Sequence, residues 1–259
     1  MALLTDDAVI TLDDLLTFES SLAQVAASHG INVETKISLS ITNVGNKLLM
    51  WLYSVGASDP QWLTRRSLGL STIVITPTLH RWICFDALTR FFAEAYNVQL
   101  NTRFQGKWAE YQKEATEAAA TFFMSGVGGV YNALSRPRLP LVSVQDGTAA
   151  AQAIFIQTAW VDSLGHESAL SAVNGQVLSG AASIVVAMAE GAIAVPSSAA
   201  GWNVYASDTQ TGLSLQCLAP LPIGSTWQLP ATGLTAGGVP KDGQKPEYYV
   251  TLSRQIKRG

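Results

Sequence analysis

Cysteine and histidine are scarce in this chain, since its 259 residues include 2 cysteines and 3 histidines. Cys84 and Cys217 lie in different halves, which argues against a disulfide framework or a zinc cluster and predicts two small core residues. The histidines stand apart in the sequence, and a lone neighbouring carboxylate at Glu167 makes no zinc motif. We therefore expect no metal site and no cofactor. The histidines are His29, His80 and His166.

Positive charge is missing from a long stretch. No Lys or Arg occurs from Leu139 to Pro240, whereas the residues after Pro240 carry an excess of cations. The whole chain has a formal net charge of −3. It shows no basic stripe with interleaved aromatic residues, which disfavours tight nucleic-acid binding and is compatible with a surface past which DNA slides.

The chain also lacks a signal peptide pattern and a long apolar run. Met1–Val9 carries Asp6 and Asp7 where a signal peptide has basic residues, so export by that route is not expected. The longest weakly charged apolar stretch, Ala181–Val195, is interrupted by Glu190 and is shorter than the roughly 20 residues of a spanning helix. We interpret it as a buried strand and expect no membrane partner.

Catalytic motifs are absent. The sequence contains no Gly-x-Ser-x-Gly, no His-Glu-x-x-His and no dinucleotide or kinase fingerprint, so we expect no enzyme. Glu110, Glu114 and Glu117 share a helix face, but they alternate with lysines and are typical of a solvated surface. Gly126–Gly129 lacks the Lys-Ser/Thr of a phosphate loop and is predicted to be a flexible joint.

Helical periodicity governs the first half. Thr11–Asp14 forms an approximate capping box that predicts a helix as far as Ser28, and Asn32 can cap a second helix with an apolar stripe from Val33 to Val55. Thr76-Pro77 predicts the start of a third, strongly buried helix that ends near Asn97. A fourth helix runs from Phe104 to Phe122, and four such helices form a bundle.

Short strand patterns govern the second half. Seven apolar or alternating runs are separated by Gly, Pro, Asn, Asp and Ser, which is typical of an antiparallel β-sandwich. The turn after Trp160 is supplied by Asp162, Ser163 and Gly165. The predicted strands are Leu139–Val144, Ala153–Val161, Ser168–Leu178, Ser183–Ala189, Gly201–Ser207, Leu213–Leu218 and Ser225–Leu229.

These patterns predict an α+β chain with more than one domain. An all-α helical bundle occupies residues 1–136, a stiff proline-containing linker occupies 137–140, and an antiparallel sandwich occupies 141–252. A basic tail, 253–259, completes the chain. Such a tail is either a solvated end or a segment that docks on an acidic partner.

The residues carry a resemblance to known families. Thr158–Ser168, with the sequence TAWVDSLGHES, followed by Gly201–Tyr205, resembles the fibronectin type III-like domains of bacteriophage structural proteins. The resemblance covers roughly the last 120 residues of the chain. The helical half, which opens with Ile10–Leu15, resembles the head-to-tail adaptor (connector) proteins of tailed phages.

The resemblance implies a structural virion protein of the neck, assembled in the host cytoplasm. It implies a ring, usually twelvefold, that joins the portal protein to a tail or nozzle protein while genomic DNA passes through without sequence-specific binding. The C-terminal segment of such adaptors often reaches into the portal. One apolar anchor among cations suits docking on an acidic groove, and the candidate residues are Arg254, Gln255, Ile256, Lys257 and Arg258.

Two alternatives stay open. The sandwich could bind a cell-surface glycan through Trp202, Tyr205 or Trp227, although a tryptophan in a strand is more often a core residue. The chain could also be another neck or tail-completion protein, which differs from an adaptor only in its partner. The arginine pairs 65–66 and 136/138 are candidates to contact phosphate or a neighbouring subunit, and ordinary surface charge explains them equally well.

Overall fold

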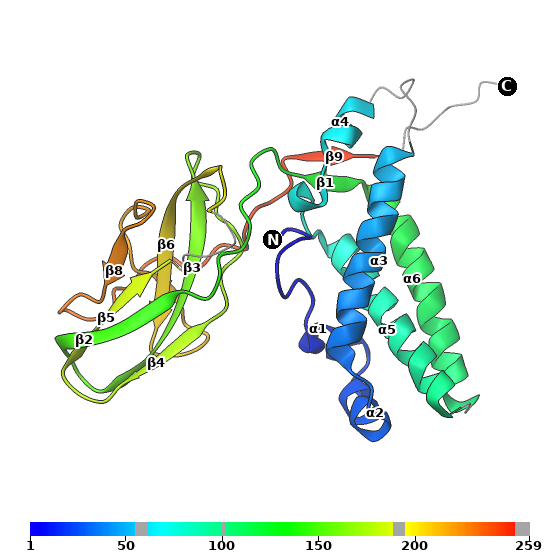
Figure 1. Ribbon diagram of the computed structural model, residues 1–259, viewed down its shortest axis with the longest axis horizontal. Helices are drawn as coiled ribbons and strands as arrows, with labels where there is room; N and C mark the ends of the chain where they lie inside the picture. The colour runs from blue at the N-terminus through cyan, green and yellow to red at the C-terminus, as the bar shows by residue number, and fades with distance from the viewer. Residues whose placement is uncertain (55–61, 100–101, 189–194, 252–259) are drawn as a thin grey trace. The chain divides into compact units, whose positions relative to one another are not determined.

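The computed structural model describes residues 1–54, 62–99, 102–188 and 195–251, which form two compact units (Figure 1). The helical unit comprises Asp7–Tyr131 and the residues from Pro246 onward, and the described helices all lie in it. The β unit comprises Met1–Asp6 and Asn132–Lys245. The fold class is therefore α+β, with helices first and antiparallel sheets after them, as the sequence predicts.

The longest helices described are α3 (Val33–Tyr53), α5 (Pro77–Gln99) and α6 (Gln105–Ser125). Both α3 and α6 pack against α5. The predicted start signals are used, because the Asn32 side chain accepts a hydrogen bond from Thr35 N at 3.0 Å and α5 begins at the predicted proline. These helices form the framework of the helical unit.

The first predicted helix is two helices, α1 (Leu12–Phe18) and α2 (Leu22–His29). The capping box is confirmed, since Thr11 Oγ1 accepts from Asp14 N at 3.3 Å and the Asp14 carboxylate accepts from Thr11 N at 2.8 Å. Glu19 ends α1 in an extended conformation, and its carboxylate bonds to side chains of α6. Because this contact is tertiary, the local helical pattern did not predict the break.

Further short helices complete the unit, and the sequence patterns did not predict them. They are α4 (Trp62–Ser67) and two 3₁₀ helices, Leu70–Thr72 and Thr102–Phe104.

The core of the helical unit is rich in aromatic rings. The rings of Phe92 and Tyr111 are stacked with centroids 5.4 Å apart, and those of Trp82 and Phe122 lie 5.6 Å apart. The side chains of Trp82, Phe91 and Phe92 are buried, which confirms that α5 is strongly buried. Ring pairs of this kind, together with the apolar area that they remove from water, join α5 to α6.

A small antiparallel sheet closes the helical unit. Strand β1 (Val127–Gly129) pairs with β9 (Tyr248–Val250), which comes after the entire β unit. The prediction of a flexible joint at residues 126–129 is therefore wrong, because these glycines occur where another chain segment approaches closely. A Cβ atom on Gly128 would lie 2.8 Å from Pro246 Cγ, and one on Gly129 would lie 2.7 Å from the ring of Tyr248.

The β unit contains two antiparallel sheets. The strand order is β2-β5-β8 in one sheet and β4-β3-β6-β7 in the other (Figure 1). Compared with the predicted runs, the third strand is much shorter, and Ala189, the last residue of the predicted fourth strand, lies outside the described residues. The bounds are β2 (Leu141–Ala149), β3 (Gln152–Asp162), β4 (Asn174–Leu178), β5 (Ala182–Ala187), β6 (Ala199–Ser207), β7 (Ser214–Leu215) and β8 (Thr226–Gln228).

Both sheets contribute to one hydrophobic core. Ile184 and Val186 of β5 and Trp227 of β8 belong to the same buried cluster as Trp160 of β3 and Trp202 of β6. Trp160 and Trp202 are direct cross-strand partners, and the indole N–H of Trp202 donates to Pro222 O at 3.0 Å. Residues of alternate positions on neighbouring strands therefore point into the same apolar interior.

Two serine side chains explain why the third predicted strand is short. Strand β4 pairs only with the first half of β3, and an irregular segment lies beside the second half. There, Ser168 Oγ accepts from Trp160 N and Ser171 Oγ accepts from Thr158 N, both at 3.0 Å. Because hydroxyl groups take the place of strand carbonyls, the edge of β3 that faces away from β6 is hydrogen-bonded in its second half without a regular ladder.

The division into units differs from the predicted boundaries at both ends of the chain. Met1–Asp6 joins the β unit, where Leu3 is buried and the Asp6 carboxylate accepts from Arg136 N at 2.8 Å. The residues from Pro246 join the helical unit through β9, although they fall inside the predicted sandwich. The cause in both cases is a long-range contact that strand and helix patterns do not encode.

Candidate interaction surfaces

The predicted docking residues, Arg254 to Arg258, lie outside the described residues. The structure does describe the chain immediately before them, which is held by Arg65 of α4. Arg65 is 2% exposed, its Nη2 donates to Thr251 O at 2.7 Å, and its guanidinium lies 4.3 Å from the ring centroid of Trp51. The sequence left Arg65 open as a surface charge or a phosphate contact. The structure instead shows it as an internal anchor for the end of β9.

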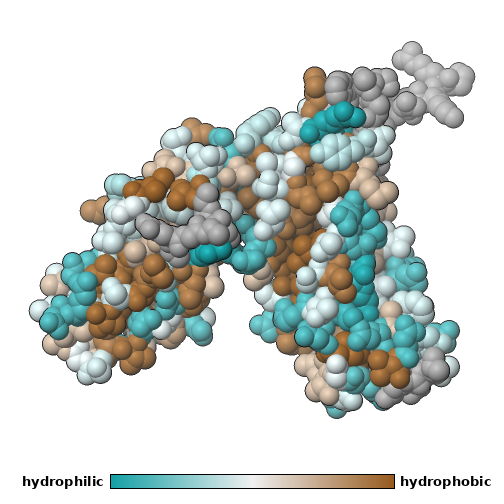
Figure 2. Space-filling model, viewed as in Figure 1, coloured by the Kyte–Doolittle hydropathy of each residue, from teal (hydrophilic) through white to brown (hydrophobic). Residues whose placement is uncertain are grey.

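A groove of about 600 Å³ lies between α3 and α6, with α5 as its base. Trp51, Trp82 and Phe123 form an aromatic lining, with the Trp51 and Phe123 centroids 5.2 Å apart and those of Trp82 and Phe123 5.4 Å apart. Polar residues line the groove as well, among them Asn43 and Gln112. Figure 2 shows a lengthwise band of hydrophilic residues next to hydrophobic ones on the visible face of the helical unit.

The charges of this groove centre on Asp86. Its carboxylate is paired with Arg90 Nε at 2.7 Å, lies 3.7 Å from Lys47 Nζ, and accepts from Asn43 Nδ2 at 2.9 Å. Lys47 Nζ also lies 5.8 Å from the ring centroid of Trp82. Two cations thus surround one carboxylate, and the groove has a net positive charge above an aromatic base.

A buried carboxylate, that of Glu19, lies at the end of α1. The buried Glu19 carboxylate accepts from Lys107 Nζ at 2.7 Å, from Tyr111 Oη at 2.9 Å and from Ser21 Oγ at 2.6 Å. Burial opposes ionisation of Glu19, but these hydrogen bonds outweigh it and lower its pKa to about 2. Burial and the contact with Glu19 raise the pKa of Tyr111. Glu19 is therefore a structural ion that ties α1 to α6.

His80 lies between Cys84 and Asp14 in an order that resembles a cysteine–histidine–acid triad. His80 Nδ1 is 3.8 Å from Cys84 Sγ, and its Nε2 is 3.4 Å from Asp14 Oδ1. The Cys84 side chain is fully buried, and burial, with the Asp14 charge adding to it, raises the thiol pKa to about 12. Such a thiol stays protonated near neutral pH and is no nucleophile. Sequence reasoning missed this contact because Asp14 is far away along the chain.

In the parts of the chain that the structure describes, no group of three His, Cys, Asp or Glu residues is close enough to hold a metal ion. No described helix has both the length and the apolar character needed to cross a membrane.

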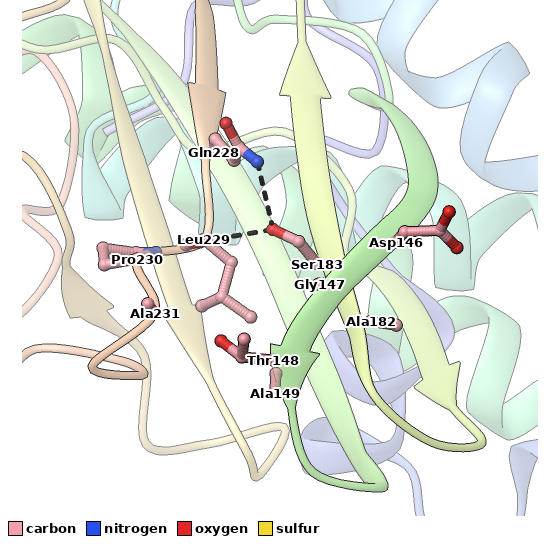
Figure 3. A pocket seen from close by; sticks show the side chains of 10 residues that line it. All are labelled: Asp146, Gly147, Thr148, Ala149, Ala182, Ser183, Gln228, Leu229, Pro230 and Ala231. Carbon is pink, nitrogen blue, oxygen red and sulfur yellow. Dashed lines mark hydrogen bonds between the residues drawn. The ribbon is translucent and has the colours of Figure 1, made fainter.

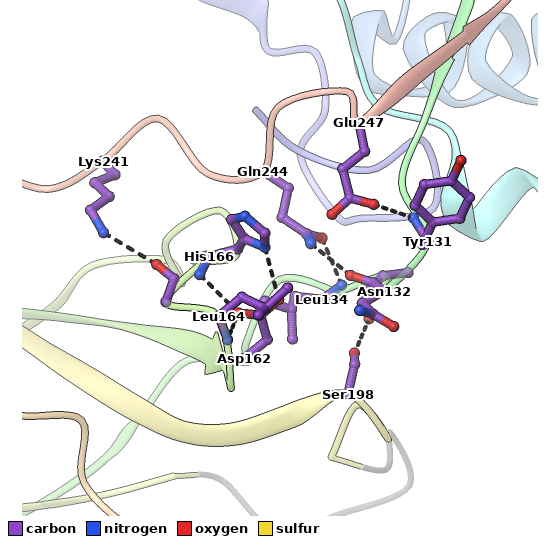
Figure 4. A network of polar contacts seen from close by, with 12 residues as sticks. Tyr131, Asn132, Leu134, Asp162, Leu164, His166, Ser198, Lys241, Gln244 and Glu247 are labelled. Carbon is purple, nitrogen blue, oxygen red and sulfur yellow. Dashed lines mark hydrogen bonds and ion pairs between the residues drawn. The ribbon is translucent and has the colours of Figure 1, made fainter.

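The β unit contains a polar network around the turn after β3 (Figure 4). Asp162 accepts from the backbone N–H groups of Leu164 at 2.9 Å and His166 at 2.8 Å, and its other oxygen lies 2.9 Å from His166 Nδ1. Burial opposes ionisation of Asp162, but the hydrogen bonds from His166 and Leu164 prevail and lower its pKa. The predicted turn is thus a rigid hairpin end.

Glu167, next to this turn, is a second buried carboxylate. It accepts from Tyr205 Oη at 2.7 Å and from Asn203 Nδ2 at 3.0 Å, and Lys241 Nζ lies 3.1 Å from it. Burial and then the hydrogen bond to Glu167 raise the pKa of Tyr205. Lys241 also donates to Gly165 O, so the segment that leads out of the β unit is fastened to the turn.

Gln244 fastens the same segment a few residues later. Its side-chain oxygen accepts from Leu134 N and its nitrogen donates to Asn132 O, both at 2.7 Å (Figure 4). The two polypeptide segments at this boundary of the β unit, one entering and one leaving, are therefore held together by a single buried amide.

A shallow pocket of about 350 Å³ lies at the irregular end of β2, between β5 and the residues after β8 (Figure 3). Ser183 Oγ donates to Leu229 O at 3.3 Å and accepts from Gln228 Nε2 at 3.4 Å, so its polar groups bond to each other. Among the described residues that line it, Asp146 is the only acidic or basic one.

The aromatic residues considered for glycan binding are not available on the surface. Trp202 is 0% exposed, Tyr205 is 1% exposed and Trp227 is 6% exposed. The alternative reading of a strand tryptophan as a core residue is therefore confirmed for this unit.

Comparison with known proteins adds no assignment: no family model, no curated protein and no solved structure matches this chain.

Proposed function

We propose that this chain is a structural protein of a tailed phage, a head-to-tail adaptor whose copies form a ring, twelvefold by resemblance. It joins the portal protein to a tail or nozzle protein in the neck of the virion, lets genomic DNA pass without sequence-specific binding, and is not an enzyme. It is assembled in the host cytoplasm and has no membrane partner.

One observation carries the proposal: β9 returns the chain to the helical unit after the β unit is complete. Residues 132–245 of the β unit are thus inserted between two parts of the helical unit, whereas Met1–Asp6 of the β unit precedes both parts. In the proposed adaptor the helical unit makes the ring, and the basic residues that follow β9 in the sequence dock on the portal. Arg65 holds Thr251, the last described residue before them.

We further propose that the β unit is a fibronectin type III-like sandwich. The order β4-β3-β6-β7 corresponds to the order C′-C-F-G of immunoglobulin-like sandwiches, and Trp160 lies buried on β3, which has the place of strand C. Strands β2 and β5 then have the places of B and E. Strand β8 differs, because it lies beside β5, where such folds have strand D, although it comes last in the chain.

The test is native mass spectrometry of the full chain, alone and mixed with the portal protein of the same phage. We expect a complex with ring stoichiometry. Deleting Ser253 to Gly259 should leave both units folded and abolish portal binding. A matched control replaces Arg254, Lys257 and Arg258 by Gln and keeps Ile256, which separates the ionic from the apolar contribution.

A monomer that ignores the portal protein would contradict the adaptor. It would favour an accessory or adhesion protein of the virion, to be examined on a glycan array, or another neck or tail-completion protein. Unchanged portal binding after the deletion would reject only the role of the tail.

A further inference from the structure

The helical unit has an open position where a bundle would hold another helix. In a four-helix bundle each helix packs against two neighbours. Here α3 and α6 both pack on α5, and the groove that contains Trp51, Trp82 and Phe123 lies between them. The elements that precede α3 do not fill it, because α1 contacts α5 through His80 and Phe85, which do not line the groove.

We propose that α1 of a second copy of this chain, with the acidic segment around it, occupies this groove. The proposal rests on the proposed ring, and it names the two surfaces through which neighbouring copies meet.

Charge complementarity identifies the occupant. No Lys or Arg precedes Lys36, whereas this part of the chain includes exposed carboxylates at Asp13 and Glu34. Phe18 at the end of α1 is 40% exposed, and its ring packs on Phe85 of the same copy with the centroids 4.9 Å apart. The groove offers the complement to the carboxylates, with Lys47 and Arg90 above an aromatic base. An acidic segment fits a groove that carries cations.

Charge also argues against the chain's own tail as the occupant. Arg254, Lys257 and Arg258 have the same sign as the groove cations, so their approach to Lys47 and Arg90 is unfavourable.

The geometry of α5 allows both contacts at once. Trp82, Asp86 and Thr89 line the groove, whereas His80 and Phe85 meet α1 of the same copy. At about 100° per residue His80 points about 160° away from Trp82, whereas Phe85 lies about 40° from Thr89, beside the groove but outside its lining. Each copy can therefore offer its α1 to one neighbour and its groove to another. Such a heterologous contact builds a ring when the rotation closes.

The first experiment fills the groove. Ala119 lines it on α6, and the next residue, Ala120, is exposed and does not. We expect Ala119→Trp to weaken self-association about tenfold or more in native mass spectrometry of the full chain with the portal protein, because the indole occupies the space of α1. Ala120→Trp, the same substitution one position further along, should assemble like the unmodified chain. Circular dichroism verifies that both variants fold.

The second experiment joins the two surfaces directly. Asp13→Cys combined with Thr116→Cys, a groove residue, should give disulfide-linked ladders of copies under mild oxidation. Asp13→Cys combined with Thr121→Cys should not, since Thr121 lies on the same helix but does not line the groove.

The outcomes separate this proposal from the adaptor. A ring that forms equally well with Ala119→Trp and gives no ladder would overturn the α1 contact and leave the adaptor intact. A chain that stays monomeric with and without the portal protein would overturn both. Two results together support both proposals. Asp13→Cys with Thr116→Cys gives the ladder, and Ala119→Trp loses the ring while its monomer still binds the portal protein.

Discussion

The helical unit and the β unit satisfy their buried charges in different ways. In the helical unit Glu19 and Asp86 are paired with Lys107 and Arg90, cations from the same unit. In the β unit, the strands lie within a stretch without Lys or Arg, so Asp162 and Glu167 accept from backbone amides, Tyr205 and Asn203, and Glu167 is paired in addition with the exposed Lys241. The comparison shows that an acidic composition does not exclude buried carboxylates when uncharged donors surround them.

The largest expected effect tests whether the two units are independent. Trp202→Ala removes the fully buried indole of the β core and should cost about 3–5 kcal/mol of the free energy of unfolding. Hydrogen exchange followed by mass spectrometry should show faster exchange in β3 and β6 and unchanged protection in α5. Leu218→Ala, at an exposed site, serves as the control. Equal loss of protection in α5 would show that the units unfold as one.

The next effect sharpens the contrast in charge pairing. Glu167→Leu strands the buried donors of Tyr205 and Asn203 and should destabilise the β unit by about 2–4 kcal/mol, because each stranded donor costs about 1–3 kcal/mol. Lys241→Met removes only the exposed cation and should cost less than about 1 kcal/mol. Denaturant unfolding measures both. A larger effect of Lys241→Met would mean that the β unit depends on an ion pair after all.

A pH effect of similar or smaller size is expected in the helical unit. Because the pKa of Glu19 is lowered to about 2 in the folded chain, its contribution is complete above its ordinary value of 4.5 and is lost as pH falls from about 5 to about 2. Glu19→Gln should cost about 1.5–3 kcal/mol at neutral pH and flatten the acid limb of a stability-against-pH curve. An acid limb that stays equally steep in this variant would assign the effect to other carboxylates.

The smallest expected effects concern two glycines of the helical unit. The same substitution should change the stability of this unit in opposite directions at the two positions. Gly129→Ala places a Cβ 2.7 Å from Leu68 and Tyr248 and should destabilise the unit by about 1–3 kcal/mol. Gly106→Ala in α6 meets nothing within 4 Å and should stabilise it by about 0.5–1 kcal/mol. Thermal melts compare the two. Opposite shifts are expected from the same chemical change.

Local signals in the sequence predicted much of the fold. The capping residues Thr11 and Asn32 and the proline at the start of α5 are used as expected, and strand patterns located most of the β unit. Elements that depend on distant partners were not predictable. Glu19 interrupts a helical pattern because of α6, and residues 127–129 form a strand because of β9.

The candidate site illustrates the same limit. The cations of the groove, Lys47 and Arg90, come from two helices, and only the packing of α3 on α5 brings them to Asp86. The sequence left Arg65 open as a surface charge or as a contact for phosphate or a neighbouring subunit, whereas its guanidinium lies over the ring of Trp51 inside the unit. The basic tail was recognisable from composition alone, because an excess of Lys and Arg can be counted without knowledge of any tertiary contact.

The position of β9 after the β unit has a consequence for biosynthesis. Strand β1 is synthesised before most of the β unit, and its partner β9 is synthesised after it. A chain terminated before Tyr248 therefore carries an uncovered strand edge at β1, an exposed feature that promotes misassociation. Synthesis of the β unit thus delays formation of the sheet that closes the helical unit.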